Sequence, residues 1–352
     1  MSKTNLFLLL LISSISVLHI DCKKDESSLI SPENKLPDST SQNFTITTWE
    51  YGNGFGSSFA KDVWVFDKNN IWAVGLFSDI DSANPQHYTD ANIIRWDGIS
   101  WKPFNPFIAN SSGIKALYAL DTSLIYFADG SIIQYKNEEF IFPKLNILWL
   151  PGQSIDYVWA SSENNVWGVG AWGTVVHYDG TSWKKVTCPD NYHFKAITGS
   201  KKTGIAYGTA LEAGNNNVQI VQLQQDQLTV IGETVSKAVS AIAINDDSTI
   251  LLGGIGIDKF NLEKKNITST SAPTQYYYTS IAKVASNDIY YFAIERSTNI
   301  SVIIHYNGKR YKVIPFPYTS YCINGGISAD EDIAVFSTES ANKSLIITLR
   351  RN

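Results

Sequence analysis

The sequence predicts an all-β fold, a seven-bladed β-propeller closed by its N-terminal strand. Three observations lead to this prediction: a composition that favours sheet, a hairpin motif that recurs about every 42 residues, and a lone strand before the first full repeat. Trp, Tyr and Phe make up 12% of the 352 residues, and aromatic side chains favour the half-buried surface of a sheet. The net charge is −5, and no basic block is present, which argues against a nucleic-acid partner.

The first half of each repeat contains two alternating strands joined by a short polar turn. The two clearest copies cover residues 62–75 and 157–170, and a third covers residues 280–292. Each turn contains Asn or Asp, which is typical of a β-hairpin. The repeat therefore begins with a hairpin.

The second half of each repeat ends in a tight turn followed by an aromatic residue. Asp97-Gly98, Asp179-Gly180 and Asn307-Gly308 supply the positive φ values that such turns require. Asp179 lies 82 positions after Asp97, and Asn307 lies 128 positions after Asp179. As two and three repeats, these distances give about 42 residues for four strands, which is the period of a propeller blade.

Degenerate copies of the repeat occupy the intervals at residues 115–139, 195–231 and 239–268, and the last copy, Ile323 to Arg350, supplies only three strands. The isolated alternating strand Phe44 to Tyr51 can complete that last blade and remove the unpaired edges between the chain ends. This arrangement gives seven blades, with six or eight as alternatives.

The N-terminal region predicts export. Lys3 and the apolar run Leu6 to Leu18 have the features of a signal peptide, which we place at residues 1–21. Residues 22–43 are rich in Ser, Asp, Glu, Lys and Pro, so they are expected to form a flexible tether. The propeller domain is expected at residues 44–352.

The segment Cys22-Lys23-Lys24-Asp25-Glu26-Ser27 resembles the start of Bacteroidetes surface lipoproteins. This resemblance implies lipidation of Cys22 and display on the outer membrane, where the lipid would hold the protein at the membrane. The usual lipobox has small residues before the cysteine, whereas Asp21 stands there in this sequence. A secreted or periplasmic protein is the alternative.

The repeats ending in Tyr-Asp-Gly-x-Ser-Trp resemble BNR-like or Asp-box propeller repeats, which occur in sialidase-type and photosystem-assembly-type propellers. The resemblance covers most of residues 44–350, with clear motifs in three blades. The Asp-box itself runs Ser-x-Asp-x-Gly-x-Thr-Trp, but here Gly directly follows Asp and the leading Ser is missing. The resemblance therefore implies the fold and not an activity.

The connections between strands predict a ligand face. In a blade with strands a to d, the a–b and c–d turns share one face, and the longer b–c and d–a connections share the other. The aromatic and basic residues of those connections are the ligand-binding candidates, with packing between blades as the alternative for the aromatic ones. They are Trp149, Tyr192, His193, Tyr276, Tyr277, Tyr278, Arg296, Tyr318 and Tyr321. Asp79, Asp81 and Asp90 lie in an oxygen-rich insertion that could hold calcium, or could form a solvated loop without any cofactor.

The sequence favours binding over catalysis. A sialidase holds its substrate with three arginines around the channel, and the five arginines here supply no such triad. We therefore expect a monomeric, non-catalytic envelope protein that binds a carbohydrate, a peptide or a protein partner. The alternative is a glycan-active hydrolase or lyase that uses carboxylates such as Asp190 or Glu212.

Overall fold

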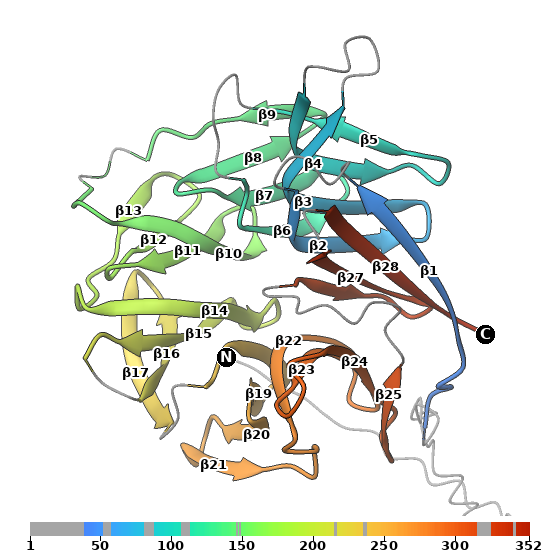
Figure 1. The fold of residues 1–352 in the computed structure, drawn as a ribbon. Helices are drawn as coiled ribbons and strands as arrows, with labels where there is room; N and C mark the ends of the chain where they lie inside the picture. Colours follow the sequence, from blue (N-terminus) through green and yellow to red (C-terminus); the bar gives the residue numbers. More distant parts are fainter. Residues whose placement is uncertain are drawn as a thin grey trace, which may run out of the picture. The chain divides into compact units, whose positions relative to one another are not determined.

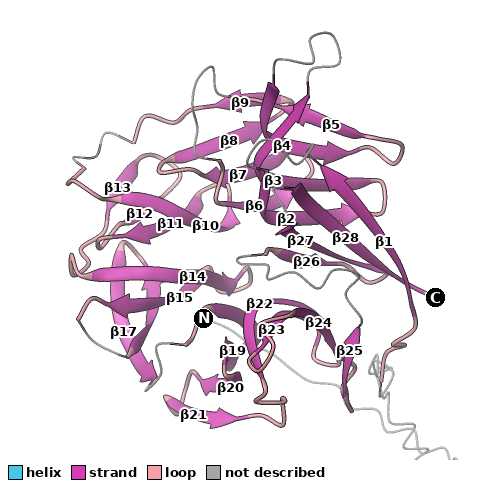
Figure 2. Cartoon of the chain, in the orientation of Figure 1, coloured by secondary structure: helices cyan, strands magenta, loops and turns pink. Residues whose placement is uncertain are grey.

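The strands of the computed structural model belong to seven four-stranded antiparallel sheets, and the described residues contain no helix (Figure 2). The structure describes residues 39–51, 58–80, 88–106, 113–145, 147, 149–214, 217–234, 238–314, 325–340 and 343–352. Signal peptide, Cys22 and most of the predicted tether lie outside these ranges.

Blades 1 to 6 each use four consecutive strands, so sequence order and sheet order coincide (Figure 1). Blade 1 contains β2 (Phe59–Asp67), β3 (Asn70–Ile80), β4 (Tyr88–Trp96) and β5 (Trp101–Phe104). Blade 2 contains β6 (Ala116–Asp121), β7 (Leu124–Ala128), β8 (Ile132–Lys136) and β9 (Glu139–Ile141). Blade 3 contains β10 (Ser154–Ser162), β11 (Asn165–Ala171), β12 (Val175–Tyr178) and β13 (Trp183–Lys185).

The next three blades follow the same plan. Blade 4 contains β14 (Tyr192–Ser200), β15 (Ile205–Glu212), β16 (Val218–Gln224) and β17 (Gln227–Thr234). Blade 5 contains β18 (Ala241–Asp246), β19 (Thr249–Gly254), β20 (Gly256–Asn261) and β21 (Asn266–Ser269). Blade 6 contains β22 (Tyr276–Ala285), β23 (Asp288–Glu295), β24 (Ser301–Tyr306) and β25 (Tyr311–Ile314).

Blade 7 joins the two ends of the described chain. Its sheet order is β1 (Phe44–Tyr51), β28 (Lys343–Arg351), β27 (Ile333–Ser340) and β26 (Ile327–Ala329). Phe44 pairs with Arg351 and Tyr51 with Ser344, so the blue and dark red strands of Figure 1 lie side by side. The seven-bladed propeller and its closure by the N-terminal strand are confirmed.

The core lies between the blades. The second strand of a blade is paired on both sides and covered on both faces, and all five residues of β7 are consequently buried. The outermost strands β5, β9, β13 and β21 stay largely exposed. Burial on both faces explains why the second strands have nearly continuous apolar sequences whereas the outer strands do not.

The three c–d turns with Asp-Gly or Asn-Gly share one geometry, which explains why these residue pairs recur. In blade 1, Asp97 Oδ1 accepts hydrogen bonds from the backbone N–H groups of Ile99 (2.9 Å) and Ser100 (2.8 Å). The equivalent contacts are made by Asp179 in blade 3 and by Asn307 in blade 6. The glycine that follows has φ near +90° in all three turns, a conformation that side chains with a Cβ rarely adopt.

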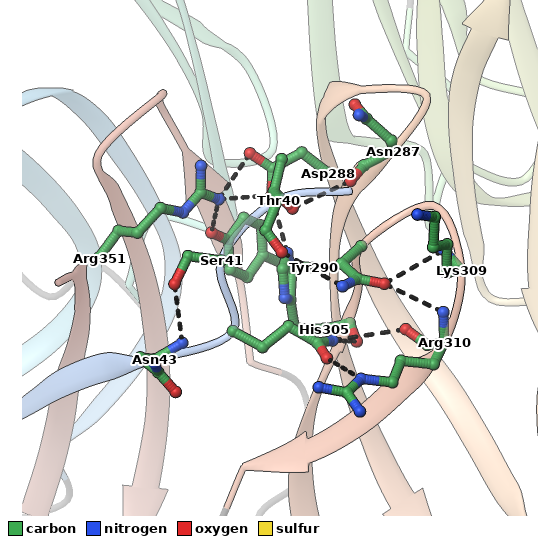
Figure 3. Close-up of polar contacts among 12 residues, drawn as sticks. Thr40, Ser41, Asn43, Asn287, Asp288, Tyr290, His305, Lys309, Arg310 and Arg351 are labelled. Atoms are coloured by element: carbon green, nitrogen blue, oxygen red, sulfur yellow. Dashed lines mark hydrogen bonds and ion pairs between the residues drawn. The ribbon is translucent and has the colours of Figure 1, made fainter. Parts of the chain in front are cut away.

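A second set of contacts fixes the closing strand to blade 6 (Figure 3). The buried carboxylate of Asp288 accepts hydrogen bonds from His305 Nε2 (2.8 Å) and from a terminal guanidinium nitrogen of Arg351 (2.6 and 2.7 Å). Gln42 Nε2 donates to the carbonyl of His305 (3.0 Å), and Arg310 Nε donates to Gln42 Oε1 (2.9 Å). We call residues Thr40 to Gln42 with these contacts the N-terminal staple.

Candidate functional site

A cavity of about 690 Å³ lies on the channel axis, between the innermost strands of all seven blades. The strand registers place one residue of each blade at the same position in its wall, just before or at the start of the innermost strand. This set, which we call the mouth ring, consists of Lys61, Lys115, Asp156, Lys195, Ser240, Thr279 and Gly325. Each innermost strand begins at a d–a connection, so the cavity opens on the face that carries the b–c and d–a connections.

Four members of the mouth ring occupy β-bulges. The pairing with the second strand shifts register around Lys61, Asp156, Lys195 and Thr279. A bulge leaves one residue unpaired and turns its side chain away from the regular alternation, and bulges often occur beside binding sites. The same irregularity in four blades therefore presents these side chains to the cavity.

The charge of the mouth ring is positive. Lys115 Nζ lies 2.5 Å from Asp156 Oδ1, so one lysine neutralises the only carboxylate of the ring. Lys61 Nζ lies 4.5 Å from the centre of the Phe59 ring, a cation–π distance. Lys195 forms no ion pair with any residue that the structure describes.

Asp62 lies one residue deeper in the channel wall. Its carboxylate accepts hydrogen bonds from the backbone N–H groups of Val63 (2.9 Å) and Leu117 (3.1 Å), and thereby links blade 1 to blade 2. Burial raises the pKa of Asp62 to about 7, because the two N–H donors only partly offset the lost hydration of the charged form. This carboxyl group therefore changes charge near neutral pH.

Below Asp62 the wall becomes aliphatic. Ile197, Ile242, Ile281 and Ile327 line both the 690 Å³ cavity and a second one of about 300 Å³ deeper in the channel. Val63, Leu117 and Val158 stand at the equivalent position of blades 1 to 3 and line the deeper cavity. The channel thus combines a cationic mouth with an apolar wall.

An exposed aromatic pair stands on the same face. Trp172, in the b–c turn of blade 3, is 48% exposed and has φ of +51°, in the left-handed region. Its ring makes an edge contact with the ring of His193, with 4.6 Å between the centroids. Gln153 Nε2 donates to the carbonyl of Trp172 (3.0 Å) and holds this turn. A non-glycine residue in this conformation carries strain, which proteins often retain at binding sites.

The aromatic candidates divide between the channel and the blade core. β14 begins at Tyr192 and β22 at Tyr276, so these residues belong to innermost strands and not, as expected, to the connections. The alternation of β22 buries Tyr276 and Tyr278 and leaves Tyr277 half-buried in the cavity wall. Tyr192 is also buried.

The remaining candidates are spread around the face. Trp149 is half-buried against the core between blades 2 and 3. Arg296 is exposed on the b–c turn of blade 6, where its Nη1 donates to the carbonyl of Thr274 (3.3 Å). Tyr318 and Tyr321 lie outside the described residues.

The calcium hypothesis rests on residues of which the structure describes only one side chain. Asp90 Oδ1 accepts a hydrogen bond from Ser78 Oγ (2.6 Å). Asp81 and the side chain of Asp79 are outside the described part. Where side chains are described, no three His, Cys, Asp or Glu residues gather as a metal site would require.

The carboxylates of the catalytic alternative lie apart from the cavity. Asp190 is exposed, and Glu212 Oε1 accepts a hydrogen bond from Asn191 Nδ2 (3.2 Å). Neither lines the channel, whereas Asp62 and Asp156 do. In the described ranges there is also no helix of the length and apolarity needed to cross a membrane.

The sequence reasoning missed the mouth lysines: Lys61 stands one residue before the first copy of the repeat, and Lys115 and Lys195 are the first residues of degenerate copies. Lys61 and Asp156 stand three residues before the paired tryptophans Trp64 and Trp159. If all seven copies are aligned on the position three residues before Trp64 and Trp159, the seven residues of the mouth ring fall in one column. The degenerate copies hid it, because Lys195, Ser240 and Gly325 precede strands without the tryptophan.

The comparisons with known proteins support the fold. No protein-family model and no curated protein matches the chain. Among solved structures, it is similar to YCF48 bound to D1 peptide, with a TM-score of 0.62, 10% identity and coverage of 89% of this chain and 99% of that chain. At these identities the likeness concerns the propeller architecture alone.

Two further similar structures are the extracellular domains of BT3049 and BT4673 from B. thetaiotaomicron. Both have a TM-score of 0.60, with identities of 12% and 14%, and each match covers 86% of this chain. This chain spans only 42% and 40% of those two chains. The WD40 β-propeller domain of Doa1 is also similar, with a TM-score of 0.57, 13% identity and coverage of 88% and 97%.

Proposed function

We propose that this protein is a non-catalytic binding module of the cell envelope, which holds a carbohydrate, a peptide or a protein partner in the channel mouth on the b–c and d–a face. The observation that carries the proposal is the mouth ring, to which every blade contributes one residue and six blades a polar or charged one. A volume of about 690 Å³ is within the range of ligand pockets, about 300–1,000 Å³. Rigid strands beneath variable connections are a common setting for such sites.

Three of the similar structures are consistent with a binding role outside the cytoplasm. YCF48 was solved with a bound peptide, and the BT3049 and BT4673 structures are extracellular domains. Trp172, His193 and Tyr277 supply aromatic surface beside or within the mouth, and aromatic rings can stack on sugar rings or on peptide side chains.

The test is a screen of glycan and peptide arrays with a soluble chain that begins at residue 37, where the unit containing the propeller starts. We expect hits whose affinity falls at least about tenfold in Tyr277→Ala or Trp172→Ala, equal to about 1.4 kcal/mol. The control is Ile99→Ala, which shortens an exposed apolar side chain in the c–d turn of blade 1, on the opposite face. Hits that survive both face variants would refute the proposed location.

Membrane attachment through Cys22 is part of the same proposal. In cells fed an alkyne-tagged fatty acid, we expect the full chain to become labelled and Cys22→Ala to remain unlabelled. Asp21→Ala should label at least as well, since it brings the junction closer to the usual lipobox. Equal labelling of the full chain and Cys22→Ala, or none in either, would contradict lipidation and favour a secreted or periplasmic protein.

A further inference from the structure

The charge of the mouth ring is opposite to that of the chain. The protein carries a net charge of −5, but its mouth ring contains three lysines and one aspartate. Lys115 is paired with Asp156, which leaves Lys61 and Lys195 as cations without a carboxylate partner among the described residues. A surplus of positive charge around a concave site attracts an anionic ligand.

The lysines stand on three different blades. Lys61, Lys115 and Lys195 come from blades 1, 2 and 4, and Asp156 of blade 3 lies between the last two in the order of blades. Charges distributed in this way around a cavity suit a ligand with several anionic groups better than a single small ion. The ligand is therefore expected to carry anionic groups at more than one place.

The aliphatic wall adds a second requirement. Ile197, Ile242 and Ile281 line the cavity below the mouth, and Ile327 completes the group. Burial of apolar ligand surface against such a wall favours binding. Peptides present carboxylates and aliphatic side chains together, whereas acidic polysaccharides present carboxylates on polar rings.

We propose that the channel mouth binds an acidic peptide segment that carries an apolar side chain, with the carboxylates at Lys61 and Lys195 and the apolar side chain on the isoleucine wall. This inference rests on the proposed binding function and specifies the ligand class of that same site. The hydroxyl of Tyr277, also in the cavity wall, offers a polar contact to the peptide backbone.

The experiment measures fluorescence anisotropy of the full chain with a labelled Asp-Glu-Leu-Glu-Asp peptide. The comparison peptides are Asn-Gln-Leu-Gln-Asn, which lacks the charges, and Asp-Glu-Gly-Glu-Asp, which lacks the apolar side chain. The test variant is Lys61→Gln with Lys195→Gln. The control, Lys68→Gln with Lys264→Gln, removes the same charge from exposed a–b and c–d turns on the other face.

We expect the acidic leucine peptide to bind the unmodified chain and the control alike, and to bind the Lys61/Lys195 variant at least about tenfold more weakly. Both comparison peptides should bind more weakly than the acidic leucine peptide. Binding should also weaken with added salt, because the Debye length falls from about 10 Å at 0.1 M to about 3 Å at 1 M. Equal melting temperatures of the two double variants would show that the fold is intact.

Equal binding by the two double variants would overturn the inference, as would tighter binding of oligogalacturonate than of the acidic peptide. A neutral ligand lost in Tyr277→Ala but retained in the Lys61/Lys195 variant would overturn the acidic-peptide inference while the proposed function stands. Array hits that no substitution on this face weakens would contradict both the acidic-peptide inference and the proposed binding function of the channel mouth.

Discussion

Asp62 shows how one residue can serve two purposes in a propeller channel. Its carboxylate joins neighbouring innermost strands through the N–H of Leu117, and it also lines the 690 Å³ cavity. The cost is a carboxyl group whose charged form is poorly hydrated, as its raised pKa indicates. The residue therefore makes both stability and channel charge depend on pH.

Replacing Asp62 with Asn should remove a specific pH dependence of stability. The carboxyl pKa is about 7 in the folded protein, against an ordinary value of 3.8 for an aspartate in water. Between these values unfolding releases a proton, so the stability of the unmodified protein relative to Asp62→Asn should fall as pH rises, and stay constant above pH 7. Urea unfolding of both proteins at several pH values measures this. A difference that does not vary with pH would contradict the raised pKa.

The same titration of Asp62 also affects ligand binding, and in the same direction: both stability and binding of an anionic ligand should decrease as pH rises. Below its pKa, Asp62 is neutral, and the surrounding charges are those of Lys61, Lys115, Lys195 and Asp156. The acidic leucine peptide should therefore bind more tightly at pH 6 than at pH 8, and Asp62→Asn should reduce this change. Anisotropy titrations at both pH values check the sign.

Arg351 holds the closing blade to blade 6 through a buried ion pair. Burial opposes the charge of Asp288, but hydrogen bonds from His305 and Arg351 outweigh it and lower the pKa of this carboxyl. Burial in turn lowers the pKa of His305, which favours the neutral ring that donates from Nε2. The network is thus built around one carboxylate with two donors.

Removing the guanidinium should destabilise the protein markedly. Arg351→Met leaves the carboxylate of Asp288 buried with His305 alone, and breaking a buried pair costs about 3–5 kcal/mol. We expect about 3 kcal/mol, because the Arg351 side chain is 18% exposed. Arg350→Met is the matched control, since Arg350 is the exposed neighbour on the same strand. Similar losses in both variants, measured by urea unfolding, would argue against the pair.

At the scale of elements, β1 is the strand on which the ring depends. It pairs along its whole length with β28, and its Trp49 ring packs on Trp96 and Trp101 of blade 1. The strand therefore supplies the fourth strand of blade 7 and packing against the next blade. The N-terminal staple then fixes its entry point on blade 6 (Figure 3).

The staple can be weakened without touching the sheet. Gln42 is 5% exposed, and both its amide atoms form hydrogen bonds with blade 6. Gln42→Ala should lower the free energy of unfolding by about 1–3 kcal/mol, because it leaves buried partners unsatisfied. Asn43→Ala, at an exposed neighbouring position, should change it by less than about 0.5 kcal/mol. Calorimetry or urea unfolding distinguishes the two, and equal effects would contradict the staple.

At the scale of the whole molecule, the sequence predicted the architecture better than the site. Blade number and closure followed from the spacing of Asp97, Asp179 and Asn307 and from one alternating strand, because turns and periodicity are local properties. The site depends instead on how the strands pair. The bulges at Lys61 and Lys195 arise from the register between the first and second strands of their blades, which the sequence does not reveal locally. Tyr276 and Tyr278 were misplaced for the same reason, since their direction depends on where β22 begins.

The two faces of the propeller also differ in where the N-terminal segment attaches, which the repeat alone does not determine. Thr40 Oγ1 donates to the carbonyl of Asn287 in the a–b turn of blade 6, and Asn307 of the c–d turn donates to the carbonyl of Thr40. The chain thus enters the propeller on the face opposite the mouth ring.

This entry point has a mechanical consequence. A pulling force transmitted along the chain towards Thr40 meets blade 6 first, through the hydrogen bonds of Thr40 and Gln42. Only after these contacts break does the load reach the eight residue pairs between β1 and β28. Under such a force the hydrogen bonds of the N-terminal staple are therefore loaded before the pairing of β1 with β28.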